Sequence, residues 1–430
     1  ASDTTSDLPL PSKDMKAYLQ VKVTVEGSGD TRASRAITEP LGGEDGNGRE
    51  TGTNHENDVN SLTVLLYKSD KDDLSEADAT IDYVYTFTGL TASSSTGGVT
   101  YTTGPREIDA AIVGKKYHVL VIANAGDMTS RCKRQNISKI RDMQMDKVCT
   151  RNDVIANFTD FVMSSKTDAK IDFSGKSGSG TGTESDPYMV DVNIERLAAR
   201  IDIIPTAAYD AASNAYYYDV KDGANVIGGF KLESVTPSKV LTKGEYLIKR
   251  VSSDAAVSAV TYFGLEEMDA TTKASTNYVV CPWTKDRTGL TLAKAEGPAS
   301  LYNVKNTTST STTDPSYILD YVMENTTTDN AETYSTGLIF KGKYYEETEW
   351  DATNHRPIAS ATGTDREYTY TIRHSDPNGT GPSTAPMYYG IVRNNIYQVK
   401  IEGVVGKTKG LKLTIHVRKW ATYTHEETTM

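Results

Sequence analysis

The residues that could do chemistry in this sequence are few, and the best match to a catalytic motif is incomplete. Gly175–Ser177 reads Gly-Lys-Ser, like the end of a phosphate-binding loop, but Lys170 stands where that loop needs its first glycine. Without this glycine, the backbone cannot make the turn whose amides surround a phosphate. A G-x-S-x-G sequence, which presents a nucleophilic serine on a strained turn, is also absent. We therefore predict no catalytic residue, and a protein that is not an enzyme.

Metal binding has two candidates in the sequence, and neither has the spacing of a known site. The histidines form no i, i+4 pair and have no neighbouring cysteine, as a zinc site would require; they are His55, His118, His355, His374, His416 and His425. One acidic run could offer oxygen ligands to calcium, but it lacks the glycine and the terminal glutamate of an EF-hand loop; it comprises Asp70, Asp72, Asp73, Glu76 and Asp78. We interpret this run as a solvated loop and expect neither a metal nor another cofactor.

Composition narrows the class of protein further. A chain of 430 residues is longer than one hydrophobic core usually grows, so two domains are expected. The net charge of −11 argues against a surface that binds nucleic acid, and no apolar run is long enough for a membrane span. Three cysteines, Cys132, Cys149 and Cys281, are too few for a disulfide framework. Cys132 could pair with Cys149, and two buried free thiols are the alternative.

The periodicity of the sequence favours strands almost throughout. Tyrosine is abundant (26 residues) and phenylalanine is not (7 residues), and tyrosine suits a half-wet pleated face. Apolar residues alternate with polar ones in one short segment after another, as in a strand with one buried face. The segments are 16–26, 62–67, 81–87, 117–123, 230–235, 278–281, 338–345, 368–372, 396–404 and 411–417. We predict an all-β protein with two sandwich-like domains of the transthyretin kind.

Two segments interrupt this pattern. Residues 27–57 are polar and glycine-rich without any periodicity, which predicts a protease-sensitive loop. Residues 130–163 are basic and follow a helical period, which predicts a short helical insertion in the N-terminal domain. The basic run could be a docking face, although a solvated helix face is the simpler interpretation.

The domain boundary is expected near Pro187, after a glycine-rich run. Beyond it, the alternation changes phase near Glu195–Arg196, which predicts a bulge or a crossing between sheets. The chain would then comprise a disordered leader (1–15), an N-terminal β domain (16–187) and a C-terminal β domain (188–430).

Several stretches, spread in order over the whole chain, resemble the fimbrillin family, the type V pilin subunits of Bacteroidia. They are the strand 16–26 with an arginine-containing loop after it, YHVLVIANAGD (117–127), FVMSS (161–165), IERLAARIDI (194–203), YVMENT (321–326), YSTGLIFKGKY (334–344) and GIVRNNIYQVKIEGV (390–404). Each stretch alone is unspecific, and the ordered set carries the resemblance.

The resemblance implies a mechanism of assembly. Family members are exported as lipoproteins to the outer membrane, and an arginine-specific protease removes the first strand. A neighbouring subunit then fills the vacated groove with its C-terminal strand. Carried over here, the displaced strand is 16–26 with Leu19, Val21, Val23 and Val25 facing the core, and cleavage follows Arg32, Arg35 or Arg49. The donor would come from 411–430 through Leu411, Leu413, Ile415, Val417, Trp420 and Tyr423, although the polar residues after Trp420 depart from an ideal donor.

The resemblance also implies the partners and leaves alternatives open. Partners would be identical subunits in a head-to-tail polymer on the cell surface, accessory or anchor proteins of the fibre, the protease, and host or bacterial surface receptors. A second possibility is an accessory or tip adhesin of the same family. A third is a surface glycan-binding lipoprotein, which would need exposed aromatic residues on one face, whereas Trp283, Trp350 and Trp420 are far apart in sequence.

Overall fold

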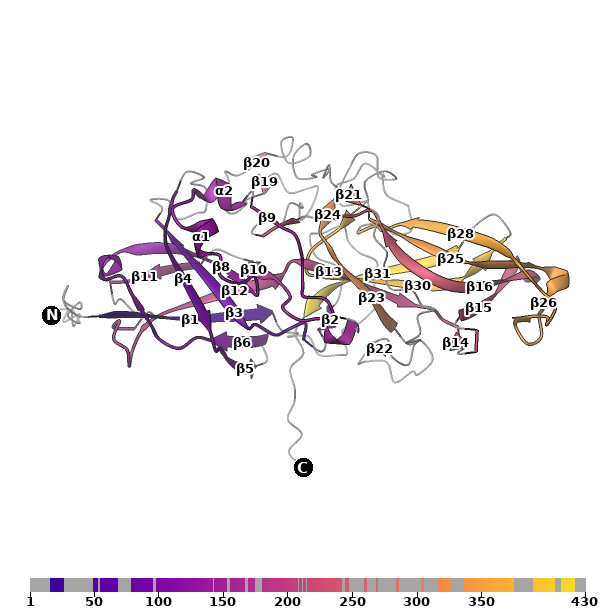
Figure 1. Cartoon of the computed structure of the whole chain (residues 1–430), viewed down its shortest axis with the longest axis horizontal. Helices are drawn as coiled ribbons and strands as arrows, with labels where there is room; N and C mark the ends of the chain where they lie inside the picture. Colours follow the sequence, from indigo (N-terminus) through magenta and orange to yellow (C-terminus); the bar gives the residue numbers. More distant parts are fainter. Residues whose placement is uncertain are drawn as a thin grey trace, which may run out of the picture.

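The structure is a computed structural model. It describes residues 16–26, 49–52, 55–68, 79–95, 98–141, 143–152, 155–166, 169–174, 180–207, 209–210, 212–213, 215–241, 244–246, 259–260, 268–269, 284–285, 303–304, 316–326, 336–374, 390–406 and 411–421. In this part of the chain, two β domains lie end to end along the long axis of the molecule (Figure 1). The predicted all-β fold with two domains is thus confirmed.

The N-terminal domain is built on one ten-stranded sheet. Its main path runs β4-β3-β8-β10-β12-β1-β6-β5, while β11 pairs with β8 and β7 with β1. The strands are β1 (Ala17–Glu26), β3 (Ser61–Tyr67), β4 (Ile81–Thr88), β5 (Thr91–Ser95), β6 (Gly98–Thr102), β7 (Arg106–Ile108), β8 (Lys116–Ala123), β10 (Met163–Ser165), β11 (Ala169–Asp172) and β12 (Tyr188–Arg196).

The C-terminal domain is built on an eleven-stranded sheet with the path β22-β23-β13-β30-β15-β16-β25-β28. Off this path, β14 pairs with β15, and β31 pairs with both β30 and β2. The strands are β2 (Arg49–Thr51), β13 (Ala198–Ile204), β14 (Tyr209–Asp210), β15 (Ala215–Asp222), β16 (Asn225–Ser238), β22 (Asn303–Val304), β23 (Ser316–Met323), β25 (Gly337–Glu346), β28 (Thr364–Thr371), β30 (Asn395–Val405) and β31 (Leu411–Ala421).

Short elements complete the described chain. Five two-stranded pairs are β17 (Val240–Leu241) with β21 (Thr284–Lys285), β18 (Gly244–Glu245) with β9 (Gln144–Met145), β19 (Ala259–Val260) with β20 (Met268–Asp269), β24 (Asn325–Thr326) with β29 (Gly390–Ile391), and β26 (Trp350–Asp351) with β27 (Arg356–Pro357). The helices are α1 (Thr129–Cys132), α2 (Ile137–Arg141) and the 3-10 turns η2 (Ala110–Ile112), η3 (Ile155–Asn157) and η4 (Glu347–Glu349).

The predicted short helical insertion is present in the N-terminal domain. Between residues 129 and 163, the described chain holds α1, α2 and η3, and it also contains strand β9. Ile137 and Ile140 of α2 are buried in the N-terminal core. Tertiary packing therefore holds these short helices against the domain.

The change of sheet lies at Leu197 rather than at the predicted boundary near Pro187. Strand β12 still belongs to the N-terminal sheet, and β13 begins the C-terminal sheet one residue after it. The phase change near Glu195–Arg196 is this crossing, as the sequence predicted. Both strands are buried around it, because Leu197 and Ala198 pack in the N-terminal core while Ala199 packs in the C-terminal core.

The loop predicted for 27–57 is anchored at its C-terminal end. Residues 49–51 form β2, which pairs in parallel with β31 at the boundary between the domains (Figure 1). Glu56 and Asn57 are buried. The prediction of an exposed loop was therefore wrong for these residues, which make backbone and side-chain bonds to the C-terminal domain. Residues 27–48, the leader 1–15, the acidic run 70–78, Gly175–Ser177 and the expected strand 278–281 lie outside the described residues.

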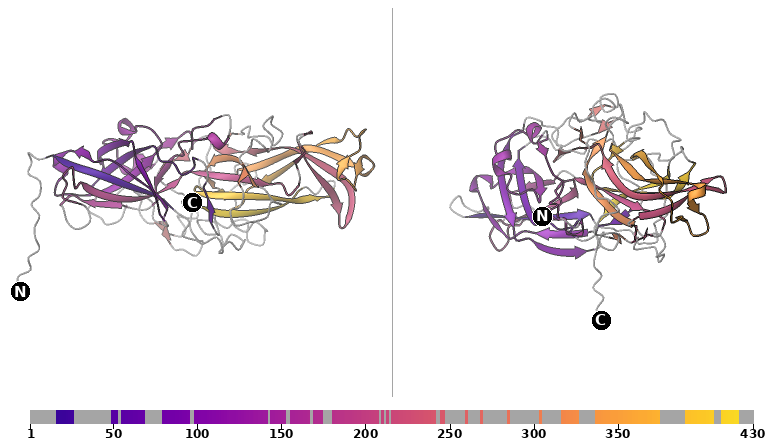
Figure 2. Two further views of the ribbon diagram at one scale, coloured as in Figure 1. Left: turned by 90° about the horizontal axis from the view of Figure 1, so that it is seen from below. Right: turned by 45° about the vertical axis from the view of Figure 1, so that its right-hand side comes forward.

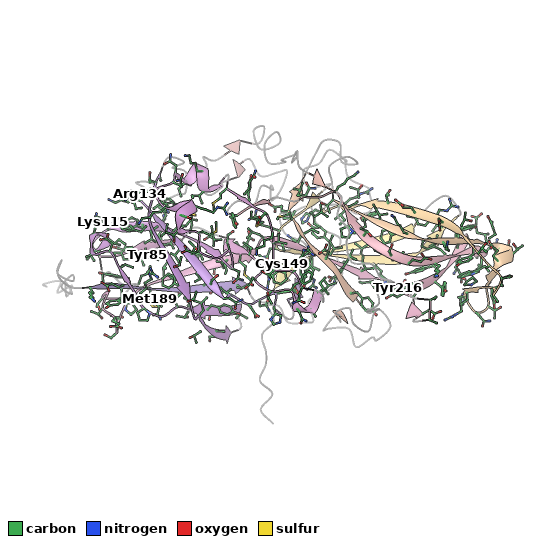
Figure 3. The ribbon with its side chains drawn as sticks, in the orientation of Figure 1. Tyr85, Lys115, Arg134, Cys149, Met189 and Tyr216 are labelled. Carbon is green, nitrogen blue, oxygen red and sulfur yellow. The ribbon has the colours of Figure 1, made fainter. Side chains whose placement is uncertain are left out.

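Cys132 and Cys149 are both buried and free, so the pairing that the sequence left open does not form. Cys149 lies near the boundary between the domains (Figure 3). Burial raises the pKa of the Cys132 thiol to about 11 and that of Cys149 to about 12.

These thiols should be unreactive in the folded protein. Thiolates are the reactive form, and at pH 8 almost none is present at either position. In a Cys281→Ser variant, iodoacetamide at pH 8 is expected to leave both cysteines unmodified until a denaturant is added. Intact mass measured with and without guanidinium checks this. Labelling of Cys132 or Cys149 without denaturant would contradict their burial.

Candidate functional site

The strand β1 lies in the interior of the N-terminal sheet, although it comes first in the sequence. It pairs in parallel with β12, from Leu19↔Tyr188 to Val25↔Ile194. On its other side it pairs antiparallel with β6 and then with β7. The strand runs from the outer end of the N-terminal domain towards the domain boundary, which is seen from below in Figure 2. Removing β1 would therefore divide the sheet between β12 and β6.

One face of β1 fills a slot in the N-terminal core. Its alternate side chains are no more than 1% exposed; they are Ala17, Leu19, Val21, Val23 and Val25. The intervening residues, Tyr18 to Thr24, are half-buried on the other face. Burying a leucine or valine side chain stabilises by about 1.5–3 kcal/mol. The predicted inward residues are therefore in the core, and the slot they occupy would be an apolar groove if the strand left.

Thr103 marks an interruption in the wall of this groove. It lies between β6 and β7, is 2% exposed, and bonds to β1 in three ways. The Val21 amide donates to Thr103 Oγ1 (3.0 Å), and the Thr103 amide donates to the Val21 carbonyl (2.9 Å). Gln20 Nε2 donates to the Thr103 carbonyl (2.8 Å). A polar side chain thus replaces the backbone acceptor at this point of the ladder.

The outer end of the groove is closed by the turn before β12. The Tyr18 amide donates to the Gly182 carbonyl (2.9 Å). Gly182 has φ +87°, and a Cβ there would lie 2.4 Å from the ring of Tyr188. Only glycine satisfies both conditions, so the glycine-rich run before β12 provides the end wall of the β1 site.

The candidate donor, β31, is an outer strand of the C-terminal sheet. It pairs antiparallel with β30 from Asn395↔Lys419 to Val404↔Leu411. Its other edge is paired to β2 only over Lys419, Trp420 and Ala421. The backbone of the predicted donor residues Leu411, Leu413, Ile415, Val417 and Trp420 therefore lies in this strand, and Tyr423 lies outside the described residues.

The candidate cleavage residues are separated by the structure. The Arg49 backbone is held in β2, opposite Lys419 of β31. Arg32 and Arg35 lie outside the described residues. A protease needs an extended, accessible backbone, so we expect Arg32 or Arg35 to be cut in preference to Arg49.

A buried ionic cluster joins the two domains next to this segment, and it was not predicted from the sequence. Arg200 on β13 donates to both Glu56 oxygens (3.0 Å each) and bonds with two nitrogens to Asp202 (2.9 Å each). All three side chains are at most 1% exposed. Burial raises the pKa of Glu56 and of Asp202, and the attraction of Arg200 works against this. Glu56 is thereby fixed to the base of the C-terminal domain.

Two further arginines extend the contact between the domains. Arg196 donates through Nε to the Glu56 carbonyl (2.8 Å) and through Nη2 to Asn57 Oδ1. Burial lowers the pKa of Arg196 to about 10, although Glu56 opposes this shift. Arg151, beside the N-terminal core, donates to Asp320 Oδ1 of β23 (2.9 Å).

Nothing in the described residues gathers a catalytic or metal site. No group of three or more metal-ligating side chains occurs there, and no helix among them is long and apolar enough to cross a membrane. Three of the histidines lie apart from one another. His118 stacks on Tyr67, His355 forms a hydrogen bond with Asp219, and His374 forms one with Tyr397. Trp350 is 6% exposed and packs between Tyr217 and Tyr345, so it offers no exposed platform for a sugar.

Comparisons with known proteins can now be set beside this geometry. Residues 42–196 match the family model described as major fimbrial subunit protein (FimA). A putative cell adhesion protein from Parabacteroides distasonis shares 15% identity over 95% of this chain and 98% of its own, with a TM-score of 0.46. The C-terminally truncated tip fimbrial protein Mfa3 from Porphyromonas gingivalis shares 12% identity over 94% and 100%, with a TM-score of 0.41. No curated protein matches the chain by sequence.

Of these comparisons, only the match to the family model is used below, because the structural similarities are weak. The matched residues begin after β1 and end with Arg196, the last residue of β12. They cover the strands of the N-terminal sheet that follow β1 and amount to less than half of the chain. Over these residues the chain is similar to the major fimbrial subunits of bacteria.

Proposed function

We propose that this protein is a fimbrial subunit that polymerises by strand exchange, with β1 as the strand that is removed and β31 of a neighbouring subunit as its replacement. The observation that carries the proposal is the position of β1. It is an interior strand with a fully buried face, and the chain that follows it contains Arg32 and Arg35. A sheet that loses such a strand presents two unpaired edges and an apolar groove, and these favour the addition of a strand from another chain.

Cleavage would act by removing a tether. While β1 stays connected to the rest of the chain, its effective concentration at the groove is about a millimolar or more. An incoming strand at micromolar concentration then competes at a disadvantage of about a thousandfold, or about 4 kcal/mol. Once the connection is cut, a displaced β1 diffuses away and exchange proceeds in one direction.

The segment after the cut is held in place independently of β1 and of β31. Arg200 of β13 binds both carboxylate oxygens of Glu56. Loss of β1, and release of β31 as a donor, would therefore leave the new N-terminal part of the chain attached to the C-terminal domain. Arg32, Arg35 and Arg49 all precede Glu56, so cleavage after any of them leaves the ionic cluster intact.

The donor strand has an exposed edge from which it can be released. Between Leu411 and Arg418, β31 pairs with β30 alone among the described strands. Release of β31 from its own domain would break this ladder. Its entry into the groove of a neighbour would form ladders on both of its sides. The donor strand therefore exchanges one ladder for two, while the acceptor exchanges the ladders of β1 for those of the donor.

The partners proposed on this basis are identical subunits in a head-to-tail fibre on the cell surface. An arginine-specific protease, a lipidated outer-membrane precursor, accessory or anchor subunits, and host or bacterial surface receptors belong to the same proposal. A stalk subunit is favoured over a tip adhesin because the described chain contains both a groove strand and an alternating donor strand.

The proposal is tested by replacing Arg32, Arg35 and Arg49 together with alanine. The three substitutions are expected to leave folding intact. They should abolish the SDS-resistant ladders that the natural sequence forms after treatment with an arginine-specific protease. Gel electrophoresis without boiling, and electron microscopy of the treated protein, provide the measurement.

A matched variant with three lysines keeps the charges and should also stay monomeric. Restoring one arginine at a time identifies the cleaved bond. If the triple-alanine variant formed long fibres, cleavage in this segment would not be the trigger. Natural-sequence protein that is cut but stays monomeric would instead indicate an accessory or tip subunit.

A further inference from the structure

The groove residues of β1 and the donor residues of β31 have nearly the same order of side chains. Residues 19–25 read Leu-Gln-Val-Lys-Val-Thr-Val, and residues 411–417 read Leu-Lys-Leu-Thr-Ile-His-Val. Aligned from Leu19 and Leu411, the inward positions are identical at both ends, and each of the two middle valines gains one methylene. The two added methylenes are a small change, so the total volume and the apolar pattern of the groove face are nearly kept.

We propose that the incoming strand occupies the groove in this one register and in the direction of β1, and that Thr103 sets the register. The inference rests on the proposed strand exchange. Leu411, Leu413, Ile415 and Val417 of the neighbour then stand at the places of Leu19, Val21, Val23 and Val25.

Neighbouring registers fit the groove less well. A shift by two residues in one direction brings Leu411 to the place of Ala17, where the slot is shaped for a methyl group, and brings Lys419 to the buried place of Val25. A shift in the other direction brings Lys407 and Lys409 to the buried places of Ala17 and Leu19. The overpacked leucine and the buried ammonium disfavour the first shift. The loss of the leucine from the first large slot disfavours the second.

The direction follows from the position of the neighbour. Because β1 begins at the outer end of the N-terminal domain, its place is entered there (Figure 1). A donor strand is attached to its own subunit before Leu411, so in the direction of β1 that subunit lies beyond the outer end. A reversed strand would place the attachment at the domain boundary of the acceptor. The β12 wall also favours the direction of β1, because its bonds are spaced for a parallel partner.

Thr103 forms hydrogen bonds with the backbone of one residue of β1, Val21. It accepts from the amide of residue 21 and donates to its carbonyl, and its own carbonyl accepts from the side chain of residue 20. In the proposed register these places are taken by Leu413 and Lys412, and the Lys412 ammonium can donate as Gln20 does. Any residue at place 21 can supply the two backbone bonds, so the side-chain bond to the Thr103 carbonyl distinguishes the registers. Residue 20 is replaced by Thr414 in one neighbouring register and by Gly410 in the other.

The register can be measured by disulfide formation in full-length protein carrying Cys281→Ser. In the uncut protein Thr24 stands opposite Thr100, so the proposed register brings His416 opposite Thr100 of the acceptor. Four variants combine Thr100→Cys with Lys412→Cys, Thr414→Cys, His416→Cys or Arg418→Cys. After cleavage and mild oxidation, only the His416 variant is expected to give a ladder that survives boiling without reductant. Thr24→Cys with Thr100→Cys in uncut protein is the positive control for the geometry.

Each other outcome overturns part of the inference. Cross-links at residue 414 or 418 would show a shifted register, and a cross-link at residue 412 would show a reversed strand. Polymers without any cross-link would refute the register while the strand exchange stands. Absence of polymers in all four variants and in the parent protein would refute the proposed function itself.

The role of Thr103 has its own measurement. Thr103→Ser keeps the hydroxyl and should keep the His416 cross-link as the sole product. Thr103→Val removes the acceptor for the buried amide and should spread cross-links over residues 414, 416 and 418, with junctions that dissociate on the order of tenfold faster. A merely structural role would weaken the fibre without changing which residues cross-link, and that result would overturn the assignment.

Discussion

Val23→Asp is expected to destabilise the uncut protein by about 4 kcal/mol or more. Val23 has no exposed surface and lies between Val192 on β12 and Tyr101 on β6. The substitution loses the burial of a valine side chain and places an unpaired carboxylate in the core. Urea unfolding followed by circular dichroism measures the loss. Thr24→Asp, one residue further on the half-buried face, is the matched control and should cost less than about 1 kcal/mol.

The same substitution should have no effect on an assembled fibre. If β1 leaves after cleavage, residue 23 leaves with it, and the groove holds the neighbour's strand instead. Fibres grown from whatever Val23→Asp protein folds should therefore dissociate in denaturant at the natural concentration. Should Val23→Asp fail to accumulate, Val23→Ala gives a smaller loss of about 2 kcal/mol with the same pattern. An equal loss of stability in the fibre would mean that β1 remains in place.

Arg200→Met is expected to destabilise the protein by about 3–5 kcal/mol at neutral pH. Arg200 is fully buried and is bound by Glu56 and Asp202, which have at most 1% exposure. Its loss leaves two buried carboxylates without the cation that compensates them. Lys343→Met is the matched control, because the Lys343–Asp365 pair (2.8 Å) is exposed and should contribute less than about 1 kcal/mol.

The cost of Arg200→Met should shrink as the pH falls. Burial raises the pKa of both carboxyl groups above their unfolded values, and without Arg200 nothing as close opposes that shift. A raised pKa means that the folded state binds protons more readily, so the penalty is present above the raised pKa and is lost as pH falls through it. The difference in unfolding free energy between variant and parent should be smaller at pH 5 than at pH 8. A difference independent of pH would show that the carboxylates are not the source of the cost, and a Glu56→Gln/Arg200→Met double variant should recover part of it.

Period-2 alternation predicted strands well where one face is buried and the other is wet. The segment 16–26 is such a case, and its inward residues were identified correctly because no other pattern fits them. The strand β23 was missed, since all eight of its residues are buried and its sequence, SYILDYVM, shows no clean alternation. β5 and β6 were missed for another reason, because short strands rich in threonine, serine and glycine resemble loops.

The polar residues that join the domains could not be found from the sequence. Glu56 stands in a glycine-rich polar stretch, and its partner Arg200 lies far along the chain on β13. Only the three-dimensional crossing of β12 into β13 brings them together. A signal was present in Arg200 and Asp202, which are charged residues inside an otherwise apolar run, LAARIDI (197–203). Charged residues in a buried strand require partners, but the sequence does not say which residues supply them.

The site divides in the same way. The groove could be predicted from the sequence because it is one strand with a local period. The end wall of the groove at Gly182, and the break in its hydrogen-bond ladder at Thr103, depend on contacts between distant segments. Neither a glycine nor a threonine indicates such a role from its type alone. The predicted boundary near Pro187 was misplaced for a related reason, since a glycine-rich run can be a wall of the domain as readily as a linker.

The pairing of β2 with β31 has a consequence for how the protein reaches its folded state. Arg49 lies opposite Lys419, so this edge of the C-terminal sheet joins segments from nearly opposite ends of the described chain. Contacts of such wide sequence separation form late, because closing so large a loop costs entropy before any bond repays it. During synthesis, residues 49–51 have no partner until almost all of the chain has emerged. The two domains therefore cannot mature one after the other, and folding is completed only when both ends of the chain are present.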